Sequence, residues 1–198
     1  MKRKSLYIAM ASLLSVVVGG NASAAFITLD GDGFKLVYDD AAVNLFGVPV
    51  ISGDGKSVLF SPLDFKATSG GTTGYVTNTS NVQFDLLLDD GQALKSVSLI
   101  ENGDYRLVNR GGTSNPEVDV SGELRLTNLF TATDFVAENF SAGALTATCT
   151  SLSNCPLNQW TTAKDILAPD SWGGVDVRVR LQNVLTAASF DVQDLAQI

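Results

Sequence analysis

Residues 175–182 read Val-Asp-Val-Arg-Val-Arg-Leu-Gln, in which apolar and polar side chains alternate at every position. Successive side chains of a β-strand point to opposite faces, so this period of two predicts a strand with one buried and one solvent-facing side. One-sided burial of this kind is typical of antiparallel sheets. The segment therefore predicts an antiparallel sheet.

Two further stretches alternate in the same way. Apolar residues occupy every second position over much of 118–126, where Gly122 predicts a bulge or bend. Residues 96–99 alternate serine with apolar residues, and 105–107 resume a strand-like pattern after the Asn-Gly at 102–103. Because both residues of an Asn-Gly pair tolerate positive φ, this pattern predicts a β-hairpin.

Shorter apolar runs bounded by Asp-Gly and Gly-Gly turn signals predict six more strands, at Phe26–Leu29, Phe34–Tyr38, Ser57–Phe60, Val82–Leu88, Leu145–Cys149 and Ser189–Val192. Short helices are expected at Thr133–Asn139 and Thr161–Leu167, and a long surface loop over Thr68–Ser80. Many short strands at this spacing predict an all-β fold, an antiparallel β-sandwich of jelly-roll or Ig-like type with at most short helices. No Pro-rich or Ser-rich linker divides residues 25–198, so we expect one domain there.

The first 24 residues have the layout of a secretory signal peptide. Lys2, Arg3 and Lys4 precede an apolar run over 6–18, and the small residues at 22–24 form a cleavage box. The apolar run is shorter than a membrane span. We therefore expect export, cleavage after Ala24 and a location outside the cell, at the cell surface or in a biofilm matrix.

The charge balance of the exported part is strongly acidic. Three of the 13 basic residues lie in the signal segment, so the remainder carries ten basic against 21 acidic residues, a net charge of −11. Like-charge repulsion disfavours nucleic acid and anionic membrane surfaces as partners. Residues 194–198 contain no apolar span or basic stop, so no membrane anchor is expected.

Cys149 and Cys155 are the only cysteines. A close, even pair in an exported protein predicts a disulfide, which at this spacing constrains the unfolded chain by about 2–3 kcal/mol. A redox pair favours the Cys-x-x-Cys spacing, and a zinc site needs more ligands.

The chain contains no histidine, which removes imidazole acid–base chemistry, Ser-His and Cys-His nucleophile pairs and His-ligated metals. A glycosidase would need two facing carboxyl groups. The glutamates, among them Glu101 beside the predicted hairpin turn, are expected to be solvated surface carboxylates. We therefore expect no enzymatic activity.

The sequence Asp30-Gly31-Asp32-Gly33 is similar to the opening of a calcium-binding loop, and Asp39 and Asp40 could complete a site of non-EF type. The alternative is a tight turn that uses Asp and Gly for positive φ. No cofactor other than calcium is expected.

Trp160 and Trp172 flank a loop that contains a proline, and together they could form a stacking platform for sugars. The alternative is that each tryptophan is part of the core.

Residues 101–107 (Glu-Asn-Gly-Asp-Tyr-Arg-Leu) and 118–126 (Val-Asp-Val-Ser-Gly-Glu-Leu-Arg-Leu), together with 51–54, 59–62 and Phe65, resemble a group of exported proteobacterial β-sandwich proteins. Proteins of that group often carry a PEP-CTERM-type sorting signal and accompany exopolysaccharide or biofilm production. This sequence lacks the Pro-Glu-Pro signal, the apolar span and the basic tail, so the resemblance implies release to the matrix.

The leading hypothesis is a secreted structural protein that assembles into fibres. The segment Ala25-Phe26-Ile27-Thr28-Leu29 follows the predicted cleavage site, and its apolar residues Phe26, Ile27 and Leu29 could add to the sheet edge of another copy. The alternative within one molecule is an ordinary first strand. The second hypothesis is an extracellular module that binds carbohydrate or calcium, with polysaccharide as its partner.

Overall fold

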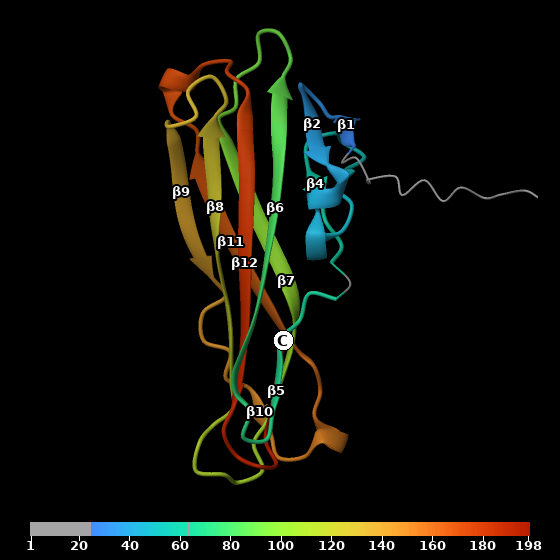
Figure 1. Ribbon diagram of the computed structural model, residues 1–198, viewed down its shortest axis with the longest axis vertical. Coiled ribbons are helices and arrows are strands. Elements are labelled where there is room, and N and C mark those ends of the chain that lie inside the picture. The colour runs from blue at the N-terminus through green and yellow to red at the C-terminus, as the bar shows by residue number, and fades with distance from the viewer. Residues whose placement is uncertain (1–24, 63) are drawn as a thin grey trace, which may run out of the picture.

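A computed structural model describes residues 25–62 and 64–198, and the predicted signal peptide lies outside the described residues. Among the described strands, β12 (Val177–Ser189) has the most extensive backbone pairing with its neighbours. It pairs antiparallel with β6 (Gly74–Leu88) along one edge and with β8 (Glu117–Asn128) along the other. The three strands run along the long axis of an elongated molecule (Figure 1). The strand predicted at 175–182 is confirmed from Val177 onward and extends to Ser189.

The first sheet grows outward from these three strands. Beyond β6 lie β2 (Phe34–Asp39) and then β1 (Phe26–Asp30), and beyond β8 lies β9 (Phe135–Ser141). Its order is therefore β1-β2-β6-β12-β8-β9, and every pairing in it is antiparallel. Strand β1 is one edge of this sheet.

The second sheet is built on β7 (Ser96–Val108), which crosses behind β6 and β12 in Figure 1. Strand β11 (Asn158–Leu167) pairs antiparallel with residues 96–105 of β7. At the other end of β7, β13 (Leu195–Gln197) pairs with residues 106–108 and β10 (Thr148–Cys149) pairs with residues 107 and 108. Strand β5 (Thr68–Gly70) lies beyond β13.

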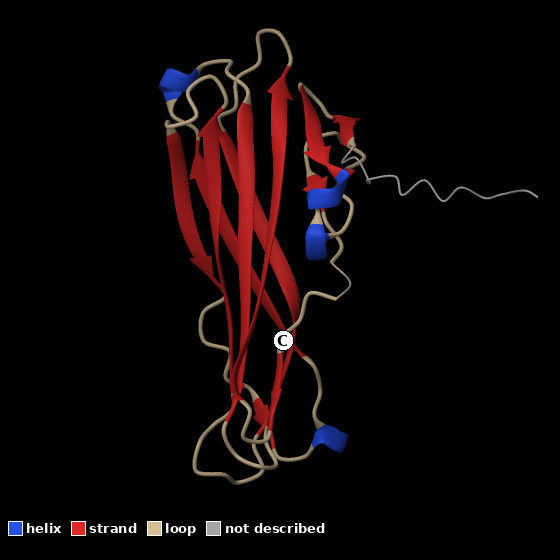
Figure 2. Ribbon diagram, viewed as in Figure 1, coloured by secondary structure: helices blue, strands red, loops and turns tan. Residues whose placement is uncertain are grey.

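The remaining elements are small. Strands β3 (Val50–Ile51) and β4 (Val58–Leu59) form a separate hairpin. The helices are single 3₁₀ turns, shown in blue in Figure 2: η1 (Asp40–Ala42), η2 (Asn44–Phe46), η3 (Leu152–Asn154) and η4 (Asp170–Trp172). The predicted all-β, sandwich-like fold is thus confirmed.

The hairpin predicted at Asn102-Gly103 is wrong, because β7 continues through it. Gly103 pairs with Trp160 of β11. A Cβ atom on Gly103 would lie 2.8 Å from the indole ring of Trp160, so the glycine is needed for close approach and not for a turn.

Other local predictions are also wrong. The segments expected to be helical belong to β9 and β11, where pairing along the strand outweighs a weak helical pattern. The loop expected over Thr68–Ser80 contains β5 and the first half of β6, and the strand expected at Ser189–Val192 is mostly a turn after β12. Of the strand predicted at Leu145–Cys149, only the last two residues are paired.

The bulge expected at Gly122 does not form either. Strand β8 stays in continuous register with β12, and Gly122 lies opposite Asn183. The position of a Cβ atom on Gly122 is taken by the carbonyl oxygen of Gln182 and the ring of Phe140. Glycine is required here because the neighbouring backbone and ring leave no room for a side chain.

We predict that Gly122→Ala lowers the free energy of unfolding by about 1–3 kcal/mol, the usual cost of overpacking a core. Gly53→Ala is the control, because no atom lies within 4 Å of the corresponding Cβ position. Urea unfolding of both variants measures the difference. Equal stability of the two variants would contradict the packing described around Gly122.

Candidate functional site

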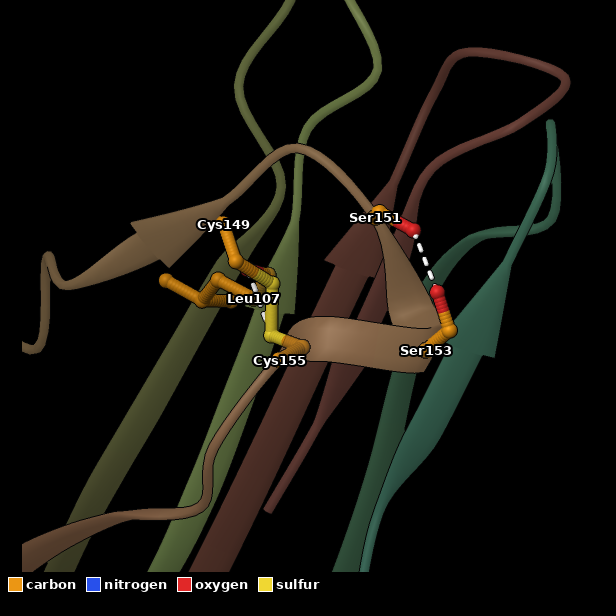
Figure 3. The surroundings of a disulfide bond; sticks show 5 residues. All are labelled: Leu107, Cys149, Ser151, Ser153 and Cys155. Atoms are coloured by element: carbon orange, nitrogen blue, oxygen red, sulfur yellow. Dashed lines mark hydrogen bonds between the residues drawn. A yellow bond between two sulfur atoms is a disulfide. The ribbon is translucent and has the colours of Figure 1, made fainter.

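The cysteine pair forms the predicted disulfide, shown in Figure 3. The Cα atoms of Cys149 and Cys155 are 5.5 Å apart, within the usual range for a disulfide. The two sulfur atoms lie 3.3 and 3.7 Å from the carbonyl oxygen of Leu107 on β7. Oxidised sulfur carries no proton, so these are contacts and not hydrogen bonds. The disulfide closes the short loop between β10 and β11 beside the end of β7.

The four predicted calcium ligands lie in two separate pairs. Asp30 is the last residue of β1 and Asp32 lies in the turn that follows, whereas Asp39 and Asp40 lie at the opposite end of this hairpin, where Asp39 pairs with Phe26. Asp32 forms an exposed ion pair with Lys56, and Asp40 accepts a hydrogen bond from the backbone N–H of Ala25. Within residues 25–62 and 64–198, no three His, Cys, Asp or Glu side chains are grouped to hold a metal ion.

The two tryptophans do not form a shared platform, because both are buried and belong to different apolar clusters. The indole N–H of Trp172 donates to the carboxylate of Asp134 at 2.7 Å. The indole N–H of Trp160 has no hydrogen-bond partner among the described residues.

The predicted assembly strand is β1, an edge strand that is hydrogen-bonded to β2 alone in the strand order. Ile27 and Leu29 are half-buried against the core, whereas the side chain of Phe26 is 77% exposed. Within one molecule, β1 is therefore the ordinary first strand that the sequence offered as an alternative.

The second sheet has an unfilled strand position beside β7. Strand β11 follows one edge of β7 over residues 96–105. On the other edge, β13 pairs with residues 106–108 only and ends near the position labelled C in Figure 1. Among the described residues, no strand pairs with this second edge along 96–105.

A groove of about 980 Å³ borders this free edge. Every residue from Ser96 to Asp104 contributes to it, so β7 presents its edge as well as its inner face. The stretch 56–62 forms another side of the groove, and β6 and β12 contribute inward-facing apolar residues. The apolar lining includes Phe46, Phe60, Phe84, Leu99, Leu181 and Leu185.

A buried polar layer crosses the core at this groove. Along the inward face of β12, Val177, Val179 and Leu181 belong to one apolar cluster, whereas Leu185 and Ala187 belong to another. Asn183 lies between them. It faces Ser80 of β6 in the strand register, and its side-chain N–H donates to Oε1 of Glu101 on β7 at 2.8 Å.

Several polar atoms of this layer have no hydrogen-bond partner among the described residues. They are Oε2 of Glu101, Oδ1 of Asn183, Oγ of Ser80 and the indole Nε1 of Trp160. Glu101, Asn183 and Trp160 all border the groove. Because unpartnered buried polar atoms are costly, this is the place in the groove where an added hydrogen-bonding group would gain most.

Burial raises the pKa of Glu101 to about 7, and the hydrogen bond donated by Asn183 opposes this shift only in part. The carboxyl group is thus half protonated near neutral pH. The expectation that Glu101 is a solvated surface carboxylate is wrong, because its side chain points inward from β7 toward Asn183.

The sequence does contain a signal for this layer. Val97, Leu99, Tyr105 and Leu107 occupy alternate positions of β7, and Glu101 falls on the same side as these residues. Asn183 likewise interrupts the apolar side of β12. Polar residues at inward positions on two facing strands, such as Glu101 on β7 and Asn183 on β12, predict a buried polar contact. The prediction requires that both strands are first assigned correctly.

No helix within the described residues is long and apolar enough to span a membrane. Comparison with protein families, with curated proteins and with solved structures finds no match to this chain.

We predict that Glu101 makes stability depend on pH. The pKa of Glu101 is higher in the folded than in the unfolded chain. At a pH between these two pKa values, folding is therefore accompanied by uptake of a proton. The associated stability is fully present below pH 4.5 and is lost as the pH rises through 7, about 3 kcal/mol in all. Glu101→Gln, which keeps an acceptor for Asn183, is expected to remove this loss.

Urea unfolding at pH 4.5, 6, 7 and 8.5 measures the effect as the difference between wild type and Glu101→Gln. The control is Glu117→Gln, which changes an exposed residue of β8. If the difference between wild type and Glu101→Gln does not change with pH, the buried environment assigned to this carboxyl group is incorrect.

Proposed function

We propose that the protein is a secreted, non-enzymatic structural protein of the cell surface or biofilm matrix, which assembles into fibres by strand exchange. In the assembly, β1 of one copy occupies the vacant strand position beside β7 of the next. The observation that carries the proposal is the free edge of β7 along 96–105, which borders an apolar groove.

The acceptor has the two features that strand addition requires. Unpaired backbone N–H and C=O groups along an edge supply hydrogen bonds to an incoming strand, and an apolar groove beneath that edge receives alternate side chains. Along residues 96–104 of β7 both features are present over a length greater than that of the five-residue strand β1.

The donor is supported by the position and composition of β1. It lies at the edge of its own sheet, and Ile27 and Leu29 form an apolar face that could enter the groove of a neighbour. Donor and acceptor are different surfaces of one chain, so the contact is head-to-tail. Contacts of this type, if they do not close into a ring, produce an open filament.

A location outside the cytoplasm is supported by the signal-like segment 1–24 and by the disulfide, since disulfides persist in oxidising compartments. A structural role is supported by a sequence without histidine and by a polar layer in which, among the described residues, Glu101 is the one carboxyl group. Hydrolysis of glycosides by the usual mechanism needs two carboxyl groups that face each other.

The test uses a synthetic peptide of residues 25–30, Ala-Phe-Ile-Thr-Leu-Asp. We predict that the secreted chain forms filaments visible by electron microscopy and that excess peptide stops their growth, because the peptide fills the acceptor groove. A variant that lacks residues 25–29 should remain monomeric and should bind the same peptide in a calorimetric titration.

The matched control is the peptide with Ile27→Asp and Leu29→Asp, which has the same backbone but no apolar face. It should neither bind nor stop growth. If the deletion variant unfolds, strand exchange through β1 is still tested by comparing how the two peptides affect filament growth of the full-length secreted chain. Filaments that grow equally well with either peptide, or the absence of filaments from the secreted chain, would refute strand exchange through β1.

A second candidate function is carbohydrate binding, which the unpartnered atoms of the polar layer favour. A sugar hydroxyl both donates and accepts hydrogen bonds. These atoms have almost no exposed surface, so neighbouring side chains would have to move before a hydroxyl could donate to Oδ1 of Asn183 or Oε2 of Glu101 and accept from the indole N–H of Trp160. The apolar faces of a sugar ring would then contact the groove.

For this candidate we predict that a neutral oligosaccharide binds to the deletion variant and that Trp160→Phe weakens binding at least fivefold. Phenylalanine keeps an aromatic ring but lacks the N–H donor. Trp172→Phe is the control, because Trp172 already donates to Asp134 away from this layer. Unchanged affinity in Trp160→Phe would exclude the polar layer as a sugar site.

A further inference from the structure

The position of Glu101 within the groove has a consequence for assembly. Its Oε1 accepts from Asn183, but its Oε2 has no partner among the described residues, and the side chain borders the groove that the incoming strand would fill. A strand placed along the edge of β7 hydrogen-bonds to backbone groups and covers the groove. Oε2 already has almost no exposed surface, so filling removes the water that remains around the partly buried carboxyl group, and it does not necessarily give that group a new partner.

Within residues 25–62 and 64–198, the side chains around Glu101 include no cation that would hold it in its charged form. Asn183 contacts it from β12, Thr162 lies opposite it on β11, and Ser80 lies beside Asn183 on β6; all three are neutral. Thr162 donates its hydroxyl proton to the backbone oxygen of Ser141 and is not free for Glu101.

Two other charged residues border the groove. Lys56 lies on the stretch 56–62 and forms an exposed ion pair with Asp32. Asp104 is an exposed residue of β7, three positions from Glu101, and its side chain lies on the opposite face of the strand. Neither contributes to the shift in the pKa of Glu101, which arises from burial.

We propose that assembly takes up a proton at Glu101, so that acid favours the filament and alkaline conditions favour the monomer. This inference rests on the proposed strand exchange. Removing water from a carboxylate disfavours its charged form, and each filament contact therefore stabilises the neutral acid. The half-protonated state of Glu101 near pH 7 in the monomer places this response close to neutral pH.

The size of the effect follows from linkage. Above the pKa of the monomer, one proton must be taken up for each contact formed. The critical concentration for assembly should then rise by up to about tenfold for each pH unit between 7 and 9. The chain has no histidine and its two cysteines form a disulfide, so these side chains contribute nothing in this range. The α-amino group of the processed chain also titrates there and must be controlled for.

The experiment measures the critical concentration of the secreted chain by sedimentation at pH 6, 7, 8 and 9 and compares wild type with Glu101→Gln. The amide cannot ionise and still accepts from Asn183. We expect the critical concentration of Glu101→Gln to stay within about twofold from pH 7 to 9, apart from any contribution of the α-amino group, which both proteins share. Glu117→Gln, which changes an exposed residue, should behave like wild type.

Failure of this inference is distinguishable from failure of strand exchange. If the wild-type chain forms no filaments at any pH, the proposed function fails. If it forms filaments that the peptide of residues 25–30 stops, but wild type and Glu101→Gln respond identically to pH, strand exchange stands and proton uptake at Glu101 is refuted. Should Glu101→Gln fold poorly, the pH dependence of peptide binding to wild type provides the same measurement, and affinity that does not change from pH 7 to 9 would overturn the inference.

Discussion

The pairing of β12 with β6 on one side and with β8 on the other is the constraint on which the rest of the fold depends. It fixes the register of three long strands and thereby decides which side chains face inward. Strand β2 attaches through β6 and β9 through β8, and the second sheet packs on the apolar side that this register creates. A slip by one residue would turn Val177, Val179 and Leu181 to solvent.

The second sheet is narrower than the first, and this mismatch accounts for the candidate site. Six strands form one layer, whereas over residues 96–105 the part of the other layer that the structure describes has only β7 and β11. The short strands β3 and β4 and the stretch 56–62 cover part of the remainder without pairing to β7. An edge strand above an apolar groove is a feature that proteins usually protect or use for association. Among the described residues, the free edge of β7 and the groove beside it thus follow from the narrower second sheet, and the polar contact between Glu101 and Asn183 lies at this groove.

The sequence predicted the fold class well because the inward positions of β12 and β8 repeat with a period of two over long stretches. It also predicted the disulfide, which depends on spacing and compartment alone. It failed at Asn102-Gly103, where a local turn signal was outweighed by the pairing of β7 with β11 and by the indole of Trp160 over Gly103. Because the predicted hairpin placed Glu101 beside a turn, the sequence predicted an exposed carboxylate there and not a buried site. Neither the vacant position beside β7 nor the contact between Glu101 and Asn183 can be derived from local sequence, since both depend on strands that are distant in the chain.

Backbone hydrogen exchange of β7 can show whether β1 of another copy pairs with its free edge. The edge of β7 over residues 96–104 is open in the monomer, and in the proposed filament β1 of another copy covers it. In filaments, amide exchange in 96–104 should slow markedly relative to the monomer, while exchange in the central strand β12 should stay the same. If exchange in 96–104 is equally fast in monomer and filament, and protection appears at another edge such as β9, the vacant strand position is not the site of assembly.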